Sequence, residues 1–213
     1  PSSAASDVYK RQDYATLKDR HPGLVYCSIT GFGQTGPYAA RPGYDFLIQG
    51  MGGLMSIPGR GDGEPGAGPL KVGVALTDIL TGLYATAGIQ AALAHRDRTG
   101  EGQHIDVALL DVQVAALANQ AMNYLASGNP PDRLGNAHPN IVPYQDFATR
   151  DGHVIVTVGN DGQFRRFCGA IGRPDLADDA RYATNTARLA SRDTLIPQIQ
   201  AQMAQQSSTH WLH

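Results

Sequence analysis

Asp78 is the residue whose type and position point most directly to chemistry. It follows the small apolar run Gly73-Val74-Ala75-Leu76 and stands at the start of a long helical pattern. The N-terminus of a helix carries exposed N–H groups and partial positive charge, so we expect the pKa of this carboxyl group to be lowered. An ionised carboxylate can attack an activated acyl group and hold it covalently. The sequence equally allows a structural Asp78 that simply favours a helix N-terminus.

A second candidate is the segment Gly31-Phe32-Gly33-Gln34-Thr35-Gly36, which matches the pattern GxGxxG and follows an apolar run. In dinucleotide-binding proteins the third glycine opens a helix whose N-terminus meets the pyrophosphate. Here Pro37 and Pro42-Gly43 follow, with no helical run. The acidic residues Asp62 and Glu64 lie in a glycine-rich loop. We therefore expect a tight turn, with dinucleotide binding as the less favoured alternative.

Composition excludes several classes of function. The chain has 17 Lys and Arg against 19 Asp and Glu, a balance that argues against a nucleic-acid or anionic-membrane partner. No apolar run approaches the roughly 20 residues that span a bilayer. The histidines form no HExxH or HxH pattern, and Cys27 and Cys168 are far apart, so we expect no metal site and no disulfide framework. Free cysteines are typical of a reducing, cytoplasmic compartment.

The elements that must position Asp78 alternate in type. The helix predicted over residues 77–98 has apolar residues at helical spacing, Thr77 as its N-cap and Gly100 as its stop. Strands are predicted on both sides of it, and their alternation with helices indicates an α/β layer with a largely parallel sheet. The other predicted elements are a strand at 23–29, a short helix within 44–55, a loop at 59–69, and strands at 70–74 and 103–108, followed by a helix at 109–125.

The pattern changes at residues 127–131, which contain Gly128, Pro130 and Pro131. Beyond them, two strands at 144–149 and 153–158 flank the hairpin signal at 150–152, and helices are predicted near 163–171 and 193–205. We expect a junction or disordered segment at 1–12, part of a large α/β domain at 13–128, and a small α+β domain at 129–213. Because the sequence lacks an initial Met and stops within a helical pattern, we expect an internal fragment.

The ordered set of motifs resembles the family III CoA-transferases, which include formyl-CoA transferase, carnitine CoA-transferase and succinyl-CoA:glutarate CoA-transferase. The resemblance covers nearly all of residues 13–213. It rests on the residues SITGFGQTGP at 28–37, GYD at 43–45, GVALTD at 73–78, RTGEGQ at 98–103, DV at 106–107, GN at 135–136, PY at 143–144, DG at 151–152 and Arg188.

The resemblance implies a fold and a set of site residues. The fold is a partial Rossmann-like large domain with a parallel sheet, plus a small α+β domain, in the family's interlocked homodimer. Asp78 falls on the family's catalytic aspartate, which forms an acyl anhydride and then an aspartyl-CoA thioester. Tyr44, Asp45 and Gly31 fall in the CoA-binding part, and Gly135, Asn136 and His138 fall on the loop over the substrate.

The activity implied is transfer of CoA from an acyl-CoA donor to a free carboxylic acid. Similarity to the dicarboxylate-type members points to succinyl-CoA as the donor. The CoA thioester is a substrate, and no permanently bound cofactor is implied. Where formyl-CoA transferase has a run of glycines, this sequence has Ala137-His138-Pro139-Asn140, which argues against formate or oxalate. We expect the fragment alone to be inactive.

Two other functions remain open. The α-methylacyl-CoA racemases of the same fold use a His-Asp pair where this sequence has Tyr44-Asp45, and a tyrosine with a reference pKa near 10 is a poor base at neutral pH. A non-catalytic module that binds CoA esters or dinucleotides is the other alternative. Under that hypothesis Asp78 is only a helix-end residue. The protein catalyses no reaction, and Asp78→Ala still binds the CoA ester.

Overall fold

The computed structural model describes residues 10–213, and these form two compact units. The first unit extends to Arg133, and the second is Leu134–His213. Most of the junction expected at residues 1–12 lies outside the described residues. None of the helices within 10–213 is both long enough and apolar enough to cross a membrane.

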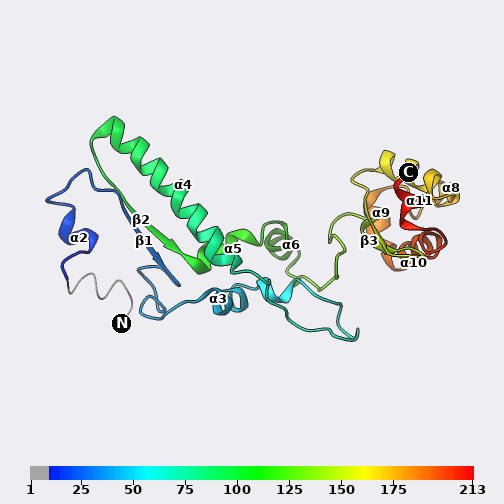
Figure 1. The fold of residues 1–213 in the computed structure, drawn as a ribbon, viewed down its shortest axis with the longest axis horizontal. Coiled ribbons are helices and arrows are strands. Elements are labelled where there is room, and N and C mark those ends of the chain that lie inside the picture. Colours follow the sequence, from blue (N-terminus) through cyan, green and yellow to red (C-terminus); the bar gives the residue numbers. More distant parts are fainter. Residues whose placement is uncertain (1–9) are drawn as a thin grey trace. The chain divides into compact units, whose positions relative to one another are not determined.

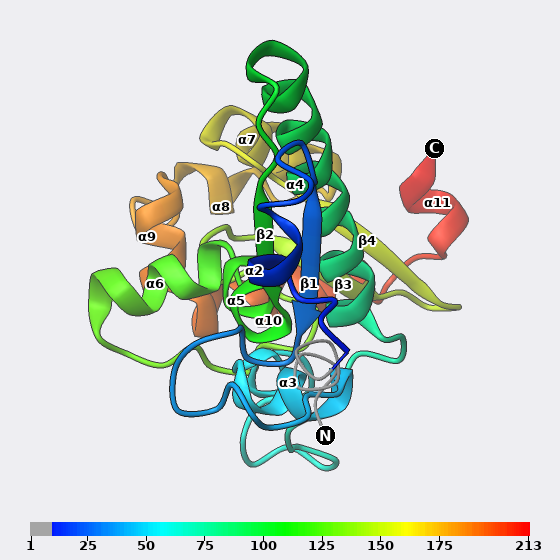
Figure 2. The same cartoon turned by 90° about the vertical axis from the view of Figure 1, so that its left-hand side faces the viewer.

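A parallel two-stranded sheet forms the centre of the first unit. Strand β1 (Tyr26–Thr30) pairs with β2 (His104–Ala108), in a register that sets Tyr26 opposite His104 and Thr30 opposite Ala108. The long helix α4 (Leu76–Thr99) connects back to β2 and lies alongside both strands (Figures 1 and 2). Its contact with the sheet buries a small core of Ala85, Val107 and Val112, with Cys27, Leu80 and Ile105 at its edge. The predicted α/β layer with parallel pairing is therefore confirmed.

Helix α4 matches the predicted helix to within one residue at each end. It stops at Gly100, which takes the left-handed conformation (φ 78°) that glycine adopts most easily. The prediction that Thr77 caps its N-terminus is wrong, because the N-cap residue is Ala75 and makes no side-chain cap. Thr77 lies inside the first turn and is fully buried.

The remaining elements of the first unit correct two predictions. Residues 70–74 form no strand, because the Val72 N–H donates to the Gln49 side chain and the Leu70 N–H to the carbonyl of Met55. The helix predicted over 109–125 is two helices, broken at Ala118 with φ 49°. The other elements are α2 (Tyr14–Leu17), α3 (Asp45–Met51), the 3-10 turn η1 (Leu54–Ser56), α5 (Leu109–Ala116) and α6 (Asn119–Ser127).

The second unit is a hairpin covered by helices. Strands β3 (Tyr144–Ala148) and β4 (His153–Thr157) pair antiparallel, as predicted. The predicted helices near 163–171 and 193–205 are also present, as α7 (Asp161–Ala170) and α10 (Arg192–Met203). Short helices complete the unit: α8 (Pro174–Asp178), α9 (Asn185–Ala190) and α11 (Ser208–Leu212).

One buried cation organises this second unit. The Arg188 side chain is fully buried and donates to the carbonyls of Val142 (2.7 Å) and Tyr182 (2.9 Å) and to Asp161 Oδ1 (2.8 Å). Its guanidinium group also lies 4.4 Å from the centre of the Phe164 ring. These contacts join the segment before β3 to helices α7 and α9 within a single apolar core.

Candidate active site

Asp78 lies in the first turn of α4 and its side chain is exposed. Among the described residues, no donor forms a hydrogen bond with its carboxylate. Its backbone N–H points instead toward Asp45 Oδ1, at the long distance of 3.4 Å. The carboxylate is therefore open to an approaching electrophile and is not committed to a structural contact.

Asp45, the first residue of α3, has the opposite situation. Its Oδ1 accepts the Thr77 N–H at 2.8 Å, and its Oδ2 accepts from Gln49 Nε2 at 2.7 Å. The first turn of a helix has N–H groups without partners inside the helix, and a carboxylate is a strong acceptor for them. Asp45 therefore caps α4 from another helix and takes the position that Thr77 was expected to fill.

The pKa of Asp78 moves in the direction opposite to the predicted one. Partial burial, and secondly the negative charge of Asp45, raise the pKa of the Asp78 carboxyl above its ordinary value. The prediction failed because, among the described residues, no helix N–H group donates to the Asp78 carboxylate, and the Thr77 N–H donates to Asp45. The Asp78 carboxylate therefore lies near a second carboxylate, that of Asp45, and accepts no hydrogen bond from the helix N-terminus.

Buried amide and hydroxyl side chains form hydrogen bonds around the N-terminus of α4. Gln49, Thr77 and Gln113 are all fully buried. Gln49 Oε1 accepts the Val72 N–H at 2.9 Å, and the Thr77 hydroxyl donates to Gln113 Oε1 at 2.5 Å. Sequence reasoning missed both glutamines. The one available signal was the spacing of Asp45 and Gln49, which puts two polar groups on neighbouring turns of a helix.

The glycine-rich segment after β1 is a turn. Residues 31–36 are followed by no helix, and Gly33 and Gly36 have φ values of 85° and 88°. The Gly33 N–H donates to Thr30 Oγ1, and the Gln34 N–H donates to Asp106 Oδ2. The expected turn is confirmed, and the helix that a dinucleotide fingerprint requires is not there.

Two other predicted residues of the first unit lie near Asp45 or the end of β1. Tyr44 immediately precedes α3, and its side chain is 74% exposed. Gly31 directly follows β1, and its carbonyl accepts the Leu110 N–H at 3.1 Å. Tyr44 thus offers a large free ring next to the capping carboxylate, whereas Gly31 acts through its backbone.

The predicted substrate loop belongs to the second unit. Gly135 has φ 60°, and Asn136 Nδ2 donates to Asp146 Oδ1 at 3.1 Å. His138 Nδ1 accepts the Asn140 N–H at 3.0 Å, and the His138 ring lies 5.2 Å from that of Tyr144. These contacts hold the loop to the start of β3 and fix the side chain of His138.

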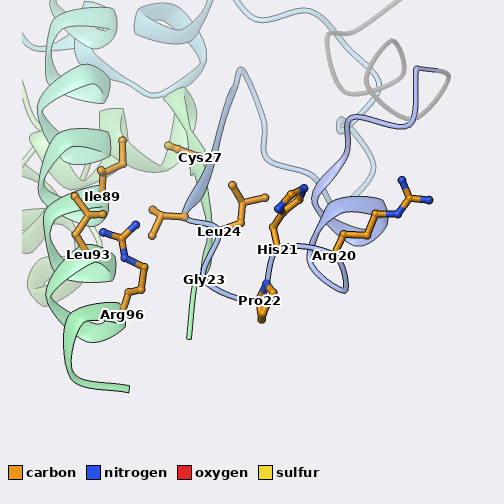
Figure 3. A pocket seen from close by; sticks show the side chains of 10 residues that line it. Arg20, His21, Pro22, Gly23, Leu24, Cys27, Ile89, Leu93 and Arg96 are labelled. Atoms are coloured by element: carbon orange, nitrogen blue, oxygen red, sulfur yellow. The ribbon is translucent and has the colours of Figure 1, made fainter. Parts of the chain in front are cut away.

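The structure also contains a cavity that does not include the predicted site. It has a volume of about 640 Å³ and lies between the segment before β1 and the C-terminal half of α4 (Figure 3). Its lining includes the basic residues Arg20 and Arg96, His21, and the apolar side chains of Leu24 and Leu93. No predicted site residue lines it. Within residues 10–213 there is also no group of three His, Cys, Asp or Glu side chains that could hold a metal ion.

Comparison with known proteins identifies the family. The profile of CoA-transferase family III matches residues 10–213. The succinate–glutarate CoA-transferase of Agrobacterium fabrum is 62% identical over 180 residues, which are 84% of this chain and 44% of that protein. The succinyl-CoA:glutarate CoA-transferase of Mus musculus is 45% identical over 199 residues, 93% of this chain and 45% of that protein.

Solved structures agree with this assignment. The crystal structure of a CAIB/BAIF family protein from Brucella suis matches with a TM-score of 0.75 and 52% identity, over 98% of this chain and 54% of that chain. A hypothetical protein from Mycobacterium tuberculosis, Rv3272, matches with a TM-score of 0.82 and 27% identity. The chain thus spans about half the length of the relatives it matches. Nearly all of its described residues align with them, and the chain belongs to CoA-transferase family III.

Proposed function

We propose that the protein is a CoA-transferase that moves CoA from succinyl-CoA to a free carboxylic acid, with Asp78 as the nucleophile. The observation that carries the proposal is the contrast between two neighbouring carboxylates. The Asp45 carboxylate is held by hydrogen bonds, whereas the Asp78 side chain is exposed and its carboxylate accepts no hydrogen bond among the described residues. The names of relatives 62% and 45% identical to this chain support the choice of succinyl-CoA as donor.

The first half of the reaction transfers CoA to the enzyme. An oxygen of the Asp78 carboxylate attacks the thioester carbonyl, the C–S bond breaks, and CoA leaves as a thiolate, which gives a mixed anhydride. The thiolate then attacks the aspartyl carbonyl of that anhydride. This step releases the donor carboxylate and leaves an aspartyl-CoA thioester on Asp78.

The second half transfers CoA to the acceptor. The acceptor carboxylate attacks the aspartyl thioester, which forms a new anhydride and releases the thiolate again. The thiolate attacks the acceptor carbonyl of this anhydride, so that the new acyl-CoA leaves and the Asp78 carboxylate is restored. No proton or external oxidant is consumed, and the energy of the thioester is retained as long as water is kept from the bound acyl groups.

The other predicted residues have supporting roles in this proposal. Tyr44, Asp45 and Gly31 belong to the part that binds CoA. The exposed ring of Tyr44 offers a surface for the CoA portion of the thioester substrate. Gly135, Asn136 and His138, in the second unit, form the loop that we assign to the substrate. The enzyme needs no permanently bound cofactor, because the CoA thioester enters and leaves as a substrate.

We further propose a Rossmann-like large domain and an interlocked homodimer for the complete protein. The parallel pairing of β1 and β2 with α4 beside them supports a Rossmann-like arrangement. Cys27 and Cys168 are both free thiols, which supports a reducing compartment such as the cytoplasm.

Trapping of the acyl-enzyme tests the nucleophile directly. The full-length protein is incubated with succinyl-CoA and treated with hydroxylamine or borohydride, and the modified peptide is mapped by mass spectrometry. We expect a hydroxamate or a reduced side chain at Asp78 and none in Asp78→Ala. The matched control is Asp97→Asn, which changes an exposed carboxylate near the other end of α4 and should label like the wild type.

Three results would change the assignment. An unmodified Asp78 across a panel of acyl-CoA donors would reject it as the nucleophile. If the same protein exchanged the α-proton of a branched acyl-CoA with deuterium from solvent, the racemase activity would take its place. If it bound acyl-CoA without either reaction, a binding protein would remain.

A further inference from the structure

The N-terminus of α4 is capped by a residue from a different helix. Ala75 supplies no side-chain cap, and the Thr77 N–H donates to Asp45 Oδ1 at 2.8 Å. The Asp78 N–H also points to this oxygen, at 3.4 Å. A single carboxylate oxygen from α3 is therefore the acceptor for the helix end that carries the proposed nucleophile.

Without Asp45, the chemistry of this helix end would be different. An aspartate in the first turn commonly accepts hydrogen bonds from the free N–H groups of its own helix. Such bonds would draw electron density from the Asp78 oxygens and would lower their nucleophilicity. Asp45 occupies the Thr77 N–H, and the Asp78 carboxylate is left with no donor among the described residues.

We propose that Asp45 is a positioning residue of the transferase: by capping α4 from outside, it keeps the Asp78 carboxylate unbonded and oriented for attack on the thioester. This inference rests on the proposed function, because it explains why the carboxylate of the proposed nucleophile, Asp78, accepts no hydrogen bond. It adds a second role to the place of Asp45 in the CoA-binding part, one that depends on contacts within the protein. Both Asp45 oxygens accept hydrogen bonds within the protein.

Two buried glutamines fix the cap. Gln49 donates to Asp45 Oδ2, and its own carbonyl oxygen accepts the Val72 N–H, so Asp45 has one available orientation. The hydroxyl of buried Thr77 donates to Gln113 Oε1. Gly52 leaves the space that Gln113 needs, since a Cβ there would lie 2.5 Å from Cγ of Gln113. The helix end is therefore held through the backbone N–H and the side chain of Thr77, with buried Gln49 and Gln113 as supports.

The charge of Asp45 gives independent support. It is the charged group that acts on Asp78 among the described residues, and it adds to the effect of burial in raising the pKa of the Asp78 carboxyl. A carboxylate with a raised pKa holds its electron pairs in a more basic, more nucleophilic state. The capping contact and the charge thus act in the same direction.

The pKa of Asp78 in the full-length protein tests the contact, measured by carbon-13 NMR of labelled aspartate carboxyls against pH. Asp45→Asn keeps an oxygen that can cap Thr77 but removes the charge, so we expect the pKa of Asp78 to fall. Asp97→Asn removes a charge from the same helix about 28 Å away and should leave it unchanged. An unchanged pKa of Asp78 in Asp45→Asn would overturn the proposal.

Kinetics test the positioning. Asp45→Ala removes the acceptor, so we expect acylation of Asp78 by succinyl-CoA to slow by about 100-fold, with Asp45→Asn between it and the wild type. In Asp45→Asn the acidic limb of the kcat/KM profile should move to lower pH, which a purely structural role would not produce. Equal rates in all three proteins would contradict the inference. If Asp45→Ala does not fold, Asp45→Asn alone decides the question.

The two proposals fail in different ways. If Asp45→Asn lowers the pKa of Asp78 but the wild type forms no adduct with succinyl-CoA, the proposed function is wrong and the contact stands. If the adduct forms normally and Asp45→Asn changes neither the pKa nor the rate, the proposed function stands and Asp45 is not a positioning residue.

Discussion

Gly31 and Gly43 lie so close together that neither can carry a side chain. A Cβ atom on Gly31 would lie 2.5 Å from the Cα of Gly43, and a Cβ on Gly43 would clash with the Cα of Gly31 in turn. Both clashes involve backbone atoms, which cannot rotate aside as the end of a flexible side chain can. This crossing fixes the end of β1 against the residue that precedes Tyr44 and Asp45, and so determines where α3 begins.

Gly31→Ala and Gly43→Ala should therefore each destabilise the protein, by about 1–3 kcal/mol, because the added methyl group must push two backbone segments apart. Urea unfolding of each variant measures the loss. Gly82→Ala is the matched control, since a Cβ there meets nothing within 4 Å inside α4, and it should raise the stability by about 0.5–1 kcal/mol. Equal stabilities of Gly31→Ala and the wild type would show that the crossing is looser than described.

Asp78→Asn should make the folded state more stable at neutral pH while it removes the proposed nucleophile. The pKa of Asp78 is raised in the folded state, so folding favours the protonated form. That contribution is fully present below the ordinary value of 3.8 and is lost as the pH rises through the higher folded pKa. Asp78→Asn has no carboxyl group to ionise at this position and keeps this stability at all pH values. Its free energy of unfolding should therefore exceed that of the wild type above the folded pKa of Asp78, and the difference should disappear below pH 3.8.

Urea unfolding of Asp78→Asn and the wild type at a series of pH values measures this difference. Because the side chain is exposed, we expect it to stay below about 1 kcal/mol. A variant that is less stable than the wild type at neutral pH would mean that the carboxylate has a favourable partner, contrary to the contacts described above.

Arg188→Met should cost the second unit about 3–5 kcal/mol, since it removes a buried cation and leaves the carbonyls of Val142 and Tyr182 without a donor. Arg188→Lys should fall between this variant and the wild type, because an ammonium group cannot reach all three acceptors at once. The control is Arg165→Met, whose ion pair with Asp178 is exposed and should contribute less than about 1 kcal/mol. Chemical denaturation, followed at Trp211 in this unit, reports the losses, and equal effects at the two arginines would contradict the assignment.

Cys168 should resist alkylation in the folded protein. Its side chain is fully buried, and burial raises the pKa of the thiol to about 11, so little thiolate is present at pH 8. Cys27 is only partly buried and should react with iodoacetamide faster. Mass spectrometry of timed samples measures both rates, and denaturant should remove the difference. Equal rates in the folded protein would mean that the core around Cys168 opens readily.

The sequence predicted the elements whose signals are local. Helix α4 has a repeating apolar face and a glycine stop, and its predicted ends differ from the observed ones by one residue. The hairpin of β3 and β4 has a turn signal between two apolar runs, and it is also where expected. The resemblance to a family, which rests on many motifs in order, pointed to Asp78 as the nucleophile, and neither its neighbours nor its helix position could have done so alone.

Two of the predictions that failed, the strand at 70–74 and the pKa of Asp78, depend on contacts between residues distant in sequence. Residues 70–74 look like a strand, but the Gln49 side chain takes the Val72 N–H. Ala118 adopts a positive φ that an alanine seldom takes, and neither glycine nor proline marks the break. The pKa of Asp78 was predicted in the wrong direction because burial and the charge of Asp45 raise it, and no pattern near Asp78 reveals either effect.

The pairing of the strands has a consequence for how the chain acquires its structure. Ala148 and His153 pair across a short turn, so the hairpin closes a small loop and needs only neighbouring residues. Tyr26 pairs with His104, which is far from it in the sequence. During synthesis β1 therefore cannot pair with β2 until most of the first unit has left the ribosome. Until then the edge of β1 that pairs with β2 is unpaired, and an unpaired strand edge can pair with another chain.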